Sequence, residues 1–440
     1  MHGKKRQRTW DTLQAIAKKA KKEPKYRFRD LRGMLSEQML KWCWRDIRKD
    51  AACGVDQVSA ADYEEHLEEN IHKLVEQLKR NIYHAKLVRR QYIPKGDGKM
   101  RPLGIPATQD KLLQLAVKKP LEAIYEQVFL SCSYGYRPNI GAKQAVIDLT
   151  AKLQFGSYRY IVEADIRSYF DSINHDWLMR MLELRIDDKP FLRLIKKWLK
   201  AGVLNTDGKV LHPITGTPQG GIISPLLANV YLHYVLDLWF EKVVKPRCGN
   251  RAYLIRYADD YVCAFEREEE ARWFREALED RLRKFGLELS TEKTRVIPFD
   301  RVQNAGETSF DFLGFEFRWG IDRKGKPNLK RRTSRKKLWN SKKNFTQWCR
   351  VNLHQRLPKL FATINAKLTG YYNYYGVIGN SRSLTEFYNH VQRTLYARLN
   401  RRSQRHSFNW LQFLNLLKRF DVPTPHITER PRVQLSLRFA

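Results

Sequence analysis

Cysteine is scarce in this chain, with 6 residues among 440, and no two of them form a C-x-x-C pair. This spacing argues against a disulfide framework or a zinc finger and predicts reduced thiols, as in a cytosol. Long apolar runs are also missing, since none approaches the ~20 residues that cross a bilayer. A basic N-terminus without a following apolar segment does not resemble a signal peptide. We therefore expect a cytoplasmic protein without membrane contacts.

Acidic residues are almost missing from the last quarter of the chain. Residues 323–440 hold 26 Lys and Arg against 3 Asp and Glu, which is +23 of the total formal charge of +35. Such an excess predicts contact with a polyanion, and a solvated basic surface is the alternative. The candidate nucleic-acid-binding residues are Lys330, Arg331, Arg332, Arg335, Lys336, Lys337, Arg401, Arg402 and Arg405.

The hydrophobic fraction of 42% in 440 residues indicates a globular chain of two or three domains. Apolar patterns indicate both strands and helices up to Ile321. We expect one last aromatic strand over 310–319, followed by a basic linker at 324–327. After the linker the pattern predicts helices alone, at 334–351, 357–368, 384–402 and 409–420.

Two adjacent carboxylates, Asp259 and Asp260, lie between the apolar segments 252–256 and 261–265. Adjacent carboxylates repel each other, so a cation is the natural reason to place them in a turn between buried strands. Asp165 ends a third apolar strand at 160–166 and is the natural third ligand. Such a set suits two Mg²⁺ ions, which nucleotidyl transfer requires.

Three sequence blocks resemble reverse transcriptases in order and spacing. Residues 165–171 (Asp-Ile-Arg-Ser-Tyr-Phe-Asp) resemble the first catalytic motif of that family, and Tyr-Ala-Asp-Asp at 257–260 resembles the second. Thr-Pro-Gln-Gly-Gly at 217–221 is similar to the Pro-Gln-Gly block. Further blocks resemble group II intron-encoded reverse transcriptases, also called maturases, at 54–56, 93–106, 133–138, 312–315 and 368–376.

The resemblance implies a role for each acid and for the steric gate. Asp165 and Asp259 would ligate both Mg²⁺ ions, and Asp260 would support the primer end. Phe170, five residues after Asp165, matches the gate that excludes a ribose 2′-hydroxyl. The alternative for Phe170 is core packing.

The resemblance also implies contacts with the incoming nucleotide. Lys95 and Arg101 would hold the triphosphate of a dNTP as fixed cations, and Gln219 would approach the nascent base pair. Lys293 resembles the lysine of the family block after the acidic hairpin. Plain surface charge is the alternative for the three cations, and a helix-entry turn is the alternative for Gln219.

The resemblance implies the α+β class and a right-hand polymerase with fingers, a palm with an antiparallel sheet, and a helical thumb. We expect an N-terminal extension at 1–80, fingers and palm at 81–322, the thumb at 323–400, and a basic nucleic-acid-binding region at 401–440. No His-Asn-His motif or late cysteine pair is present, so we expect the compact bacterial type without the C-terminal endonuclease.

The resemblance implies an RNA-directed DNA polymerase that assists splicing and retrohoming of its intron. Its partners would be template and intron RNA, DNA primer or target, and dNTPs, in a bacterial cytoplasm in association with the nucleoid. A homodimer is a possible assembly. Two alternatives stay open at this point: a domesticated reverse transcriptase of a defence or CRISPR system, and a maturase that only binds RNA.

Overall fold

The computed structural model describes residues 2–94, 100–302, 306–401 and 408–429. The chain divides into two compact units, one of residues 1–145 with 160–296 and the other of residues 146–159 with 297–440. All six cysteines are free. None of the helices in the described ranges has the length and apolarity to cross a membrane.

The first unit begins with helices that share an apolar core with the buried helix α5, Thr108–Tyr125. Ser59 caps α3 with a reciprocal capping box to Asp62, and the helical segment is divided at His66 into α3 and α4. The N-terminal helices are α1 His2–Lys22, η1 Arg32–Met34, α2 Glu37–Trp44, α3 Ala60–Glu65 and α4 Leu67–Lys79.

A hairpin follows, and it belongs to a four-stranded sheet in the order β2-β1-β4-β5. Strand β1 pairs antiparallel with β2 and parallel with β4. The strands are β1 Val88–Pro94, β2 Met100–Ile105, β4 Val203–Leu204 and β5 Val210–Leu211. Lys95, which the resemblance assigns to the triphosphate, lies outside the described residues.

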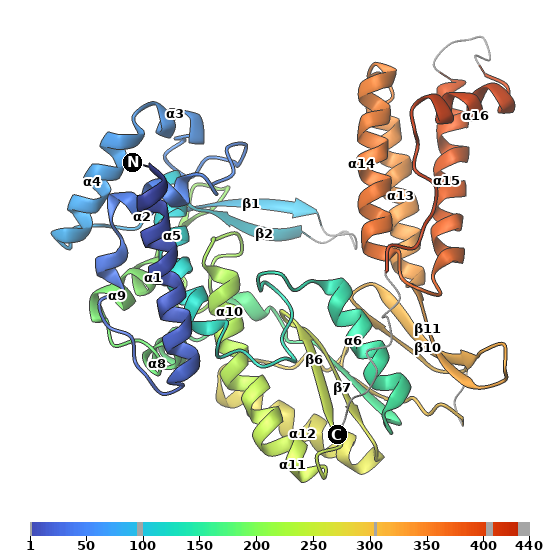
Figure 1. Ribbon diagram of the computed structural model, residues 1–440, viewed down its shortest axis with the longest axis horizontal. Coiled ribbons are helices and arrows are strands. Elements are labelled where there is room, and N and C mark those ends of the chain that lie inside the picture. Colours follow the sequence, from blue (N-terminus) through green and yellow to red (C-terminus); the bar gives the residue numbers. More distant parts are fainter. Residues whose placement is uncertain (1, 95–99, 303–305, 402–407, 430–440) are drawn as a thin grey trace. The chain divides into compact units, whose positions relative to one another are not determined.

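The second sheet has the order β6-β7-β3-β8, and Figure 1 shows β6 and β7 as neighbouring strands. Strand β7 pairs antiparallel with both β3 and β6. The strands are β3 Tyr160–Ala164, β6 Tyr253–Tyr257, β7 Asp260–Phe265 and β8 Arg295–Pro298. Helix α12, Glu268–Lys284, packs against β3 and β7.

The remaining helices of the first unit complete its core. The helical segment that begins at Ser224 is interrupted, because two π-helices follow α10. These helices are α7 Tyr169–Ser172, α8 His175–Glu183, α9 Lys189–Leu199, α10 Ser224–Leu232, η2 His233–Asp237, η3 Phe240–Val244 and α11 Lys245–Arg247.

The second unit contains a three-stranded sheet, so the expectation of one last strand was wrong. The sheet has the order β11-β10-β9, with β9 Ser309–Phe312, β10 Phe315–Ile321 and β11 Pro327–Thr333. Leu313 and Gly314 connect β9 and β10 with φ of 51° and 78°. The predicted basic linker is the turn between β10 and β11, so strands continue beyond Ile321.

Four helices follow with their own apolar core, as predicted. They are α13 Arg335–Asn352, α14 Leu357–Tyr375, α15 Ser381–Leu399 and α16 Trp410–Arg419. Helix α6, Ala142–Phe155, begins in the first unit and continues into the second. The mixture of helices with an antiparallel sheet confirms the α+β class.

Candidate active site

The β6–β7 hairpin presents the acidic pair at a two-residue turn. Tyr257 pairs with Asp260, so Ala258 and Asp259 form the turn itself. The flanking strands are buried over most of their length, whereas Asp259 is half-buried and Asp260 is exposed. A hairpin of buried apolar residues therefore carries carboxylates at its accessible end.

Asp165 lies at the same end of the sheet as Asp259. Ala164, the last residue of β3, pairs with Tyr261 at the start of β7. Burial and, less strongly, the charge of Asp165 raise the pKa of Asp259, while the cations Arg101 and Arg256 act to lower it. The two carboxylates thus lie close enough to repel each other, which is the arrangement that a divalent cation would stabilise.

Lys293 contacts Asp165 directly. Its Nζ lies 2.5 Å from Oδ2 of Asp165, and the lysine side chain is 69% exposed. The backbone fixes this neighbourhood, since the N–H of Ser290 donates to the carbonyl of Asp165 at 2.8 Å. The structure therefore brings together Asp165, Asp259 and Lys293, all three of which the sequence predicts at the site.

The three predicted acids do not form a closed metal cage. Across the described ranges, no group of three or more His, Cys, Asp or Glu side chains is close enough to hold a metal ion. Mg²⁺ commonly takes one or two protein carboxylates and completes its shell with water and substrate phosphates. Asp165 and Asp259 fit that pattern as an open pair.

Phe170 lies in α7, and its ring contacts that of Tyr136. Their ring centroids are 6.5 Å apart in an edge-on arrangement, and the Phe170 side chain is half-buried. The backbone carbonyl of Phe170 accepts a hydrogen bond from the N–H of Thr217 at 2.8 Å. Phe170 is thereby tied to the Pro-Gln-Gly loop, and it keeps both a packing surface and an exposed surface.

The loop that carries Gln219 is held against strand β2. The N–H of Gly104 donates to the carbonyl of Gln219 at 2.6 Å. Gly220 has φ of 118°, and a Cβ there would lie 2.5 Å from the carbonyl oxygen of Gly104, so only glycine fits this approach. Arg101, exposed on β2, acts electrostatically on Asp259.

The candidate nucleic-acid-binding residues of the second unit differ in exposure. Arg331 is buried and pairs with Glu429 at 2.9 Å, and Arg332 pairs with Glu316 at 2.6 Å, so both serve the fold. Lys330 is half-buried. The exposed cations are Arg335, Lys336, Lys337 and Arg401. Arg402 and Arg405 lie outside the described residues.

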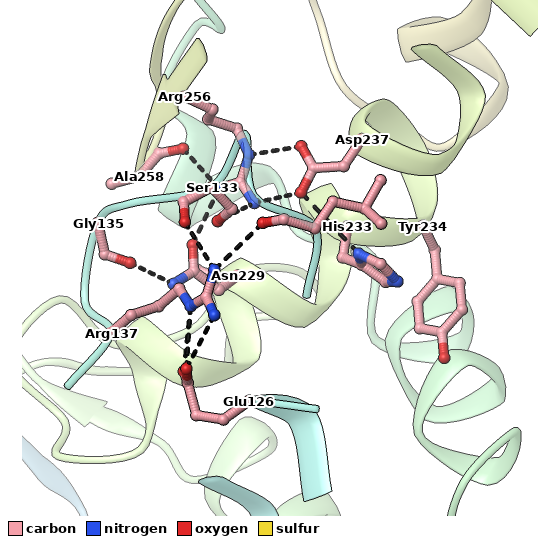
Figure 2. Close-up of polar contacts among 12 residues, drawn as sticks. Glu126, Ser133, Gly135, Arg137, Asn229, His233, Tyr234, Asp237, Arg256 and Ala258 are labelled. Carbon is pink, nitrogen blue, oxygen red and sulfur yellow. Dashed lines mark hydrogen bonds and ion pairs between the residues drawn. The ribbon is translucent and has the colours of Figure 1, made fainter. Parts of the chain in front are cut away.

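The buried polar residues that support the β6–β7 turn were not predicted from the sequence. Arg256 is fully buried in β6, and its side chain donates to Asp237, Asn229, Ser133 and Ala258 (Figure 2). A charged residue inside an apolar strand was the available signal, because buried arginine is rare unless it is paired.

A model of the family described as reverse transcriptase (RNA-dependent DNA polymerase) matches residues 93–317. The match covers just over half of the chain and includes both sheets of the first unit in large part. The chain belongs to the reverse transcriptase family, and its sheet β6-β7-β3-β8 is the palm-like antiparallel sheet expected of it. Members of this family generally use divalent metal ions.

Two proteins with similar sequences indicate which kind of reverse transcriptase the chain resembles. The chain is 32% identical over 405 residues to the group II intron-encoded protein LtrA of Lactococcus lactis subsp. cremoris, over 73% of this chain and 65% of that protein. It is 39% identical over 185 residues to the protein YkfC of Escherichia coli K12, over 41% and 48% of the two chains. The chain thus spans slightly less than two thirds of LtrA. The predicted resemblance to group II intron-encoded reverse transcriptases is confirmed.

Proposed function

We propose that the chain is an RNA-directed DNA polymerase that adds deoxynucleotides to a primer paired with an RNA template. The observation that carries this proposal is the meeting of Asp165 and Asp259 at one end of the palm-like sheet in a member of the reverse transcriptase family. The carboxylates come from strands that are neighbours in space and far apart in sequence. Such convergence indicates a shared ligand.

Asp165 and Asp259 would hold two Mg²⁺ ions together with water and the nucleotide phosphates, with Asp260 near the primer end. The ions would activate the attacking 3′-hydroxyl and stabilise the leaving pyrophosphate. Lys293 would help to hold the carboxylate of Asp165, to which its Nζ donates. The open pair leaves room for substrate oxygens, which a closed cage of protein ligands would exclude.

Neighbouring side chains would bind and select the nucleotide. Lys95 and Arg101 supply positive charge for the triphosphate, and Gln219 approaches the new base pair. The exposed edge of Phe170 would exclude a ribose 2′-hydroxyl, while its contact with Tyr136 keeps the ring in place. Each role adds to binding or selection rather than to bond making.

We further propose that the protein binds group II intron RNA and assists its splicing and retrohoming. The identity to a group II intron-encoded protein over 73% of this chain and the basic region at 323–440 support this proposal. Residues 1–80 would form the extension, 81–322 the fingers and palm, 323–400 the thumb, and 401–440 a basic contact region. The protein would act in the bacterial cytoplasm near the nucleoid.

Primer extension on an RNA template with Mg²⁺ and dNTPs tests the polymerase. We expect Asp259→Asn to lower the rate by on the order of 10³-fold, because a metal ligand supplies several kcal/mol of transition-state stabilisation. Glu279→Gln is the matched control, since this exposed carboxylate pairs with Arg283 on α12. Extension by the Asp259→Asn protein at the wild-type rate would show that the catalytic assignment is wrong.

Splicing of the intron RNA at low Mg²⁺ tests the second role separately. We expect the Asp259→Asn protein to support splicing as well as the wild type does, because RNA binding relies on the basic surface. Loss of splicing with this single carboxylate would contradict the separation of binding from chemistry. A wild-type protein that supports splicing but extends no primer would instead be an RNA-binding maturase.

A further inference from the structure

Arg256 and Asp237 form an ion pair in which both side chains are 0% exposed. The guanidinium donates through Nε to Oδ1 of Asp237 at 2.7 Å and through Nη2 to Oδ2 at 2.6 Å. Removing two charges from water costs several kcal/mol for each ion, and attraction offsets this only with good geometry. Arg256 lies in β6, three residues before Asp259, and Asp237 lies in η2. The desolvation cost of this pair therefore suggests that it has a role other than stability.

The rest of the guanidinium reaches the catalytic turn and two other elements. Nη1 donates to the carbonyl of Ala258 and to Oδ1 of Asn229, each at 2.9 Å, and Nη2 donates to Oγ of Ser133 at 2.8 Å. These three bonds and the two to Asp237 match the five N–H groups of an arginine. The carbonyl of Ala258 belongs to the peptide unit that joins it to Asp259, so the bond orients Asp259 directly.

A loop at 132–137 closes the other side of the same turn. The N–H of Tyr134 donates to the carbonyl of Arg256, and the N–H of Arg256 donates to the carbonyl of Cys132, each at 2.8 Å. A Cβ on Gly135 would lie 2.3 Å from the nitrogen of Ala258, so the loop and the turn touch backbone to backbone. Asn229 donates to the carbonyl of Gly135 at 2.5 Å.

The loop is itself fastened to the helical side of the unit. Figure 2 shows the side chain of Arg137, the last residue of the loop, directed at Glu126, and its guanidinium donates to both oxygens of that carboxylate. It also donates to the carbonyls of Leu130 and Ser133 at 3.1 Å and 2.8 Å. The turn is therefore connected through buried or half-buried polar groups to α10, to η2 and to Glu126 at the C-terminal end of α5.

The turn needs such support because Ala258 has φ of 58°, in the left-handed region. For a residue with a Cβ this conformation costs roughly 1–2 kcal/mol, and it persists only where the surroundings determine it. Asp237 ends the π-helix η2, and such an interruption re-aims side chains within a helix. In this way the interrupted helix delivers the carboxylate that holds Arg256.

We infer that Arg256, held by Asp237, is a positioning residue that fixes the orientation of Asp259 for metal binding. This inference rests on the proposed polymerase function and deepens it. Arg256 does not touch the substrate; it acts through the carbonyl of Ala258. The arrangement also couples the metal ligand to the loop at 132–137, which contributes Tyr136 beside Phe170.

Arg256→Lys tests the inference, because lysine keeps the charge for Asp237 but cannot donate to four partners at once. We expect the primer-extension rate at saturating dNTP to fall about 10- to 100-fold, the range for residues that orient metal ligands. Template–primer affinity should stay within about twofold. Mn²⁺ affinity of the protein alone, titrated by electron paramagnetic resonance, should fall by about tenfold.

Arg185→Lys is the matched control for the loss of a buried arginine. Arg185 is 4% exposed and donates to the carbonyls of Tyr26 and Ala20 at 3.2 Å and 3.3 Å, away from the turn. We expect this variant to lower the melting temperature while the extension rate and the Mn²⁺ affinity stay within about twofold of the wild type.

The inference is overturned if Arg256→Lys keeps wild-type Mn²⁺ affinity and extension rate at a reduced melting temperature. If that variant does not fold, Ser133→Ala removes one bond from Arg256, and we expect a loss of about three- to tenfold in both readouts. Unchanged readouts in a folded Ser133→Ala protein also overturn it. If the wild type extends no primer, the proposed function fails, and the Mn²⁺ comparison still decides the role of Arg256.

Discussion

At the scale of single residues, the buried pair of Arg256 and Asp237 fixes the orientation of a neighbouring peptide at the cost of desolvating two charges. Replacing a buried ion pair by apolar residues of similar volume is often neutral or stabilising, so the pair is weak evidence for stability. Its five hydrogen bonds instead define one orientation of the Ala258–Asp259 peptide. Burial raises the pKa of Asp259, whereas the charge of Arg256 acts to lower this pKa and so favours the ionised carboxylate that a cation would bind.

His233 adds a pH-dependent contribution next to this pair. The ring is 1% exposed, lies 4.0 Å from Asp237, and leaves Nδ1 without a hydrogen-bond partner. Burial lowers the pKa of His233 from 6.5 to about 4. The unfolded chain therefore takes up a proton at a higher pH than the folded chain does. Stability should fall as the pH drops from about 6.5 to about 4, by on the order of 3 kcal/mol.

Urea unfolding of the wild type and of His233→Phe at several pH values measures this contribution. We expect the free energy of unfolding of the wild type to fall relative to that of the variant across this window, and the difference to be constant above pH 7. Phenylalanine keeps the packing against Phe129, whose ring lies 5.7 Å away, and removes the titrating nitrogen. Parallel pH profiles for the two proteins would contradict a buried neutral imidazole.

At the scale of elements, helix α13 begins with charges of the wrong sign for its own stability. Arg335, Lys336 and Lys337 occupy its first turn, where the positive end of the helix dipole disfavours cations. All three side chains are exposed. A bound polyanion would reverse this unfavourable contribution, because phosphates complement both the cations and the helix N-terminus.

Charge reversal in α13 should therefore have opposite effects on stability and on binding. For Arg335→Glu with Lys336→Glu we expect a gain of roughly 0.3–1 kcal/mol per substitution in the free energy of unfolding. We expect RNA affinity to fall by about tenfold or more, because two phosphate contacts become repulsive. Thermal unfolding and filter binding at fixed salt measure the two effects. A loss of stability together with unchanged RNA affinity would identify the cluster as a structural element.

Sequence patterns predicted some turns and strands of the protein and missed others. The hairpin around 257–260 was predictable, because apolar segments flank its acidic turn. The turn between β9 and β10 was not, because Leu313 takes a positive φ that its side chain disfavours and only Gly314 signals a turn. Strand β11 reads as a basic run, yet its burial alternates and places Leu329, Arg331 and Thr333 inside. The charged side chains of this segment mask the alternation of buried and exposed residues that is typical of a strand.

The residues of the candidate site likewise include some that were predictable from the sequence and some that were not. Asp165, Asp259 and Lys293 were predictable from local motifs, and the structure brings them together. The network under the turn was not predictable, because the partners of Arg256 lie up to 123 residues away in the sequence. Pairing at such distances depends on the packing of α10 and η2, which no local pattern encodes. A buried arginine can be suspected from sequence, but its partners require the fold.

At the scale of the whole molecule, charge is distributed very unevenly along the chain. Residues 1–322 hold 56 Lys and Arg against 44 Asp and Glu, whereas residues 323–440 carry +23. Many cations of the first unit are paired, as in the helical pairs Arg272–Glu268 and Arg283–Glu279. The acid-poor region has few such partners within its own sequence, so self-repulsion there favours binding of a polyanion.

Salt should therefore weaken RNA binding steeply. If the basic region makes about six phosphate contacts, counterion release predicts a slope near −4 in a plot of log affinity against log salt concentration. Affinity would then fall by roughly 10²- to 10³-fold between 50 and 200 mM salt. Arg335→Glu with Lys336→Glu should reduce the slope by about one to two, because each lost phosphate contact removes one released counterion. An affinity that stays flat between 50 and 500 mM salt would contradict the electrostatic account, since contacts made mainly by stacking or neutral hydrogen bonds release no counterions.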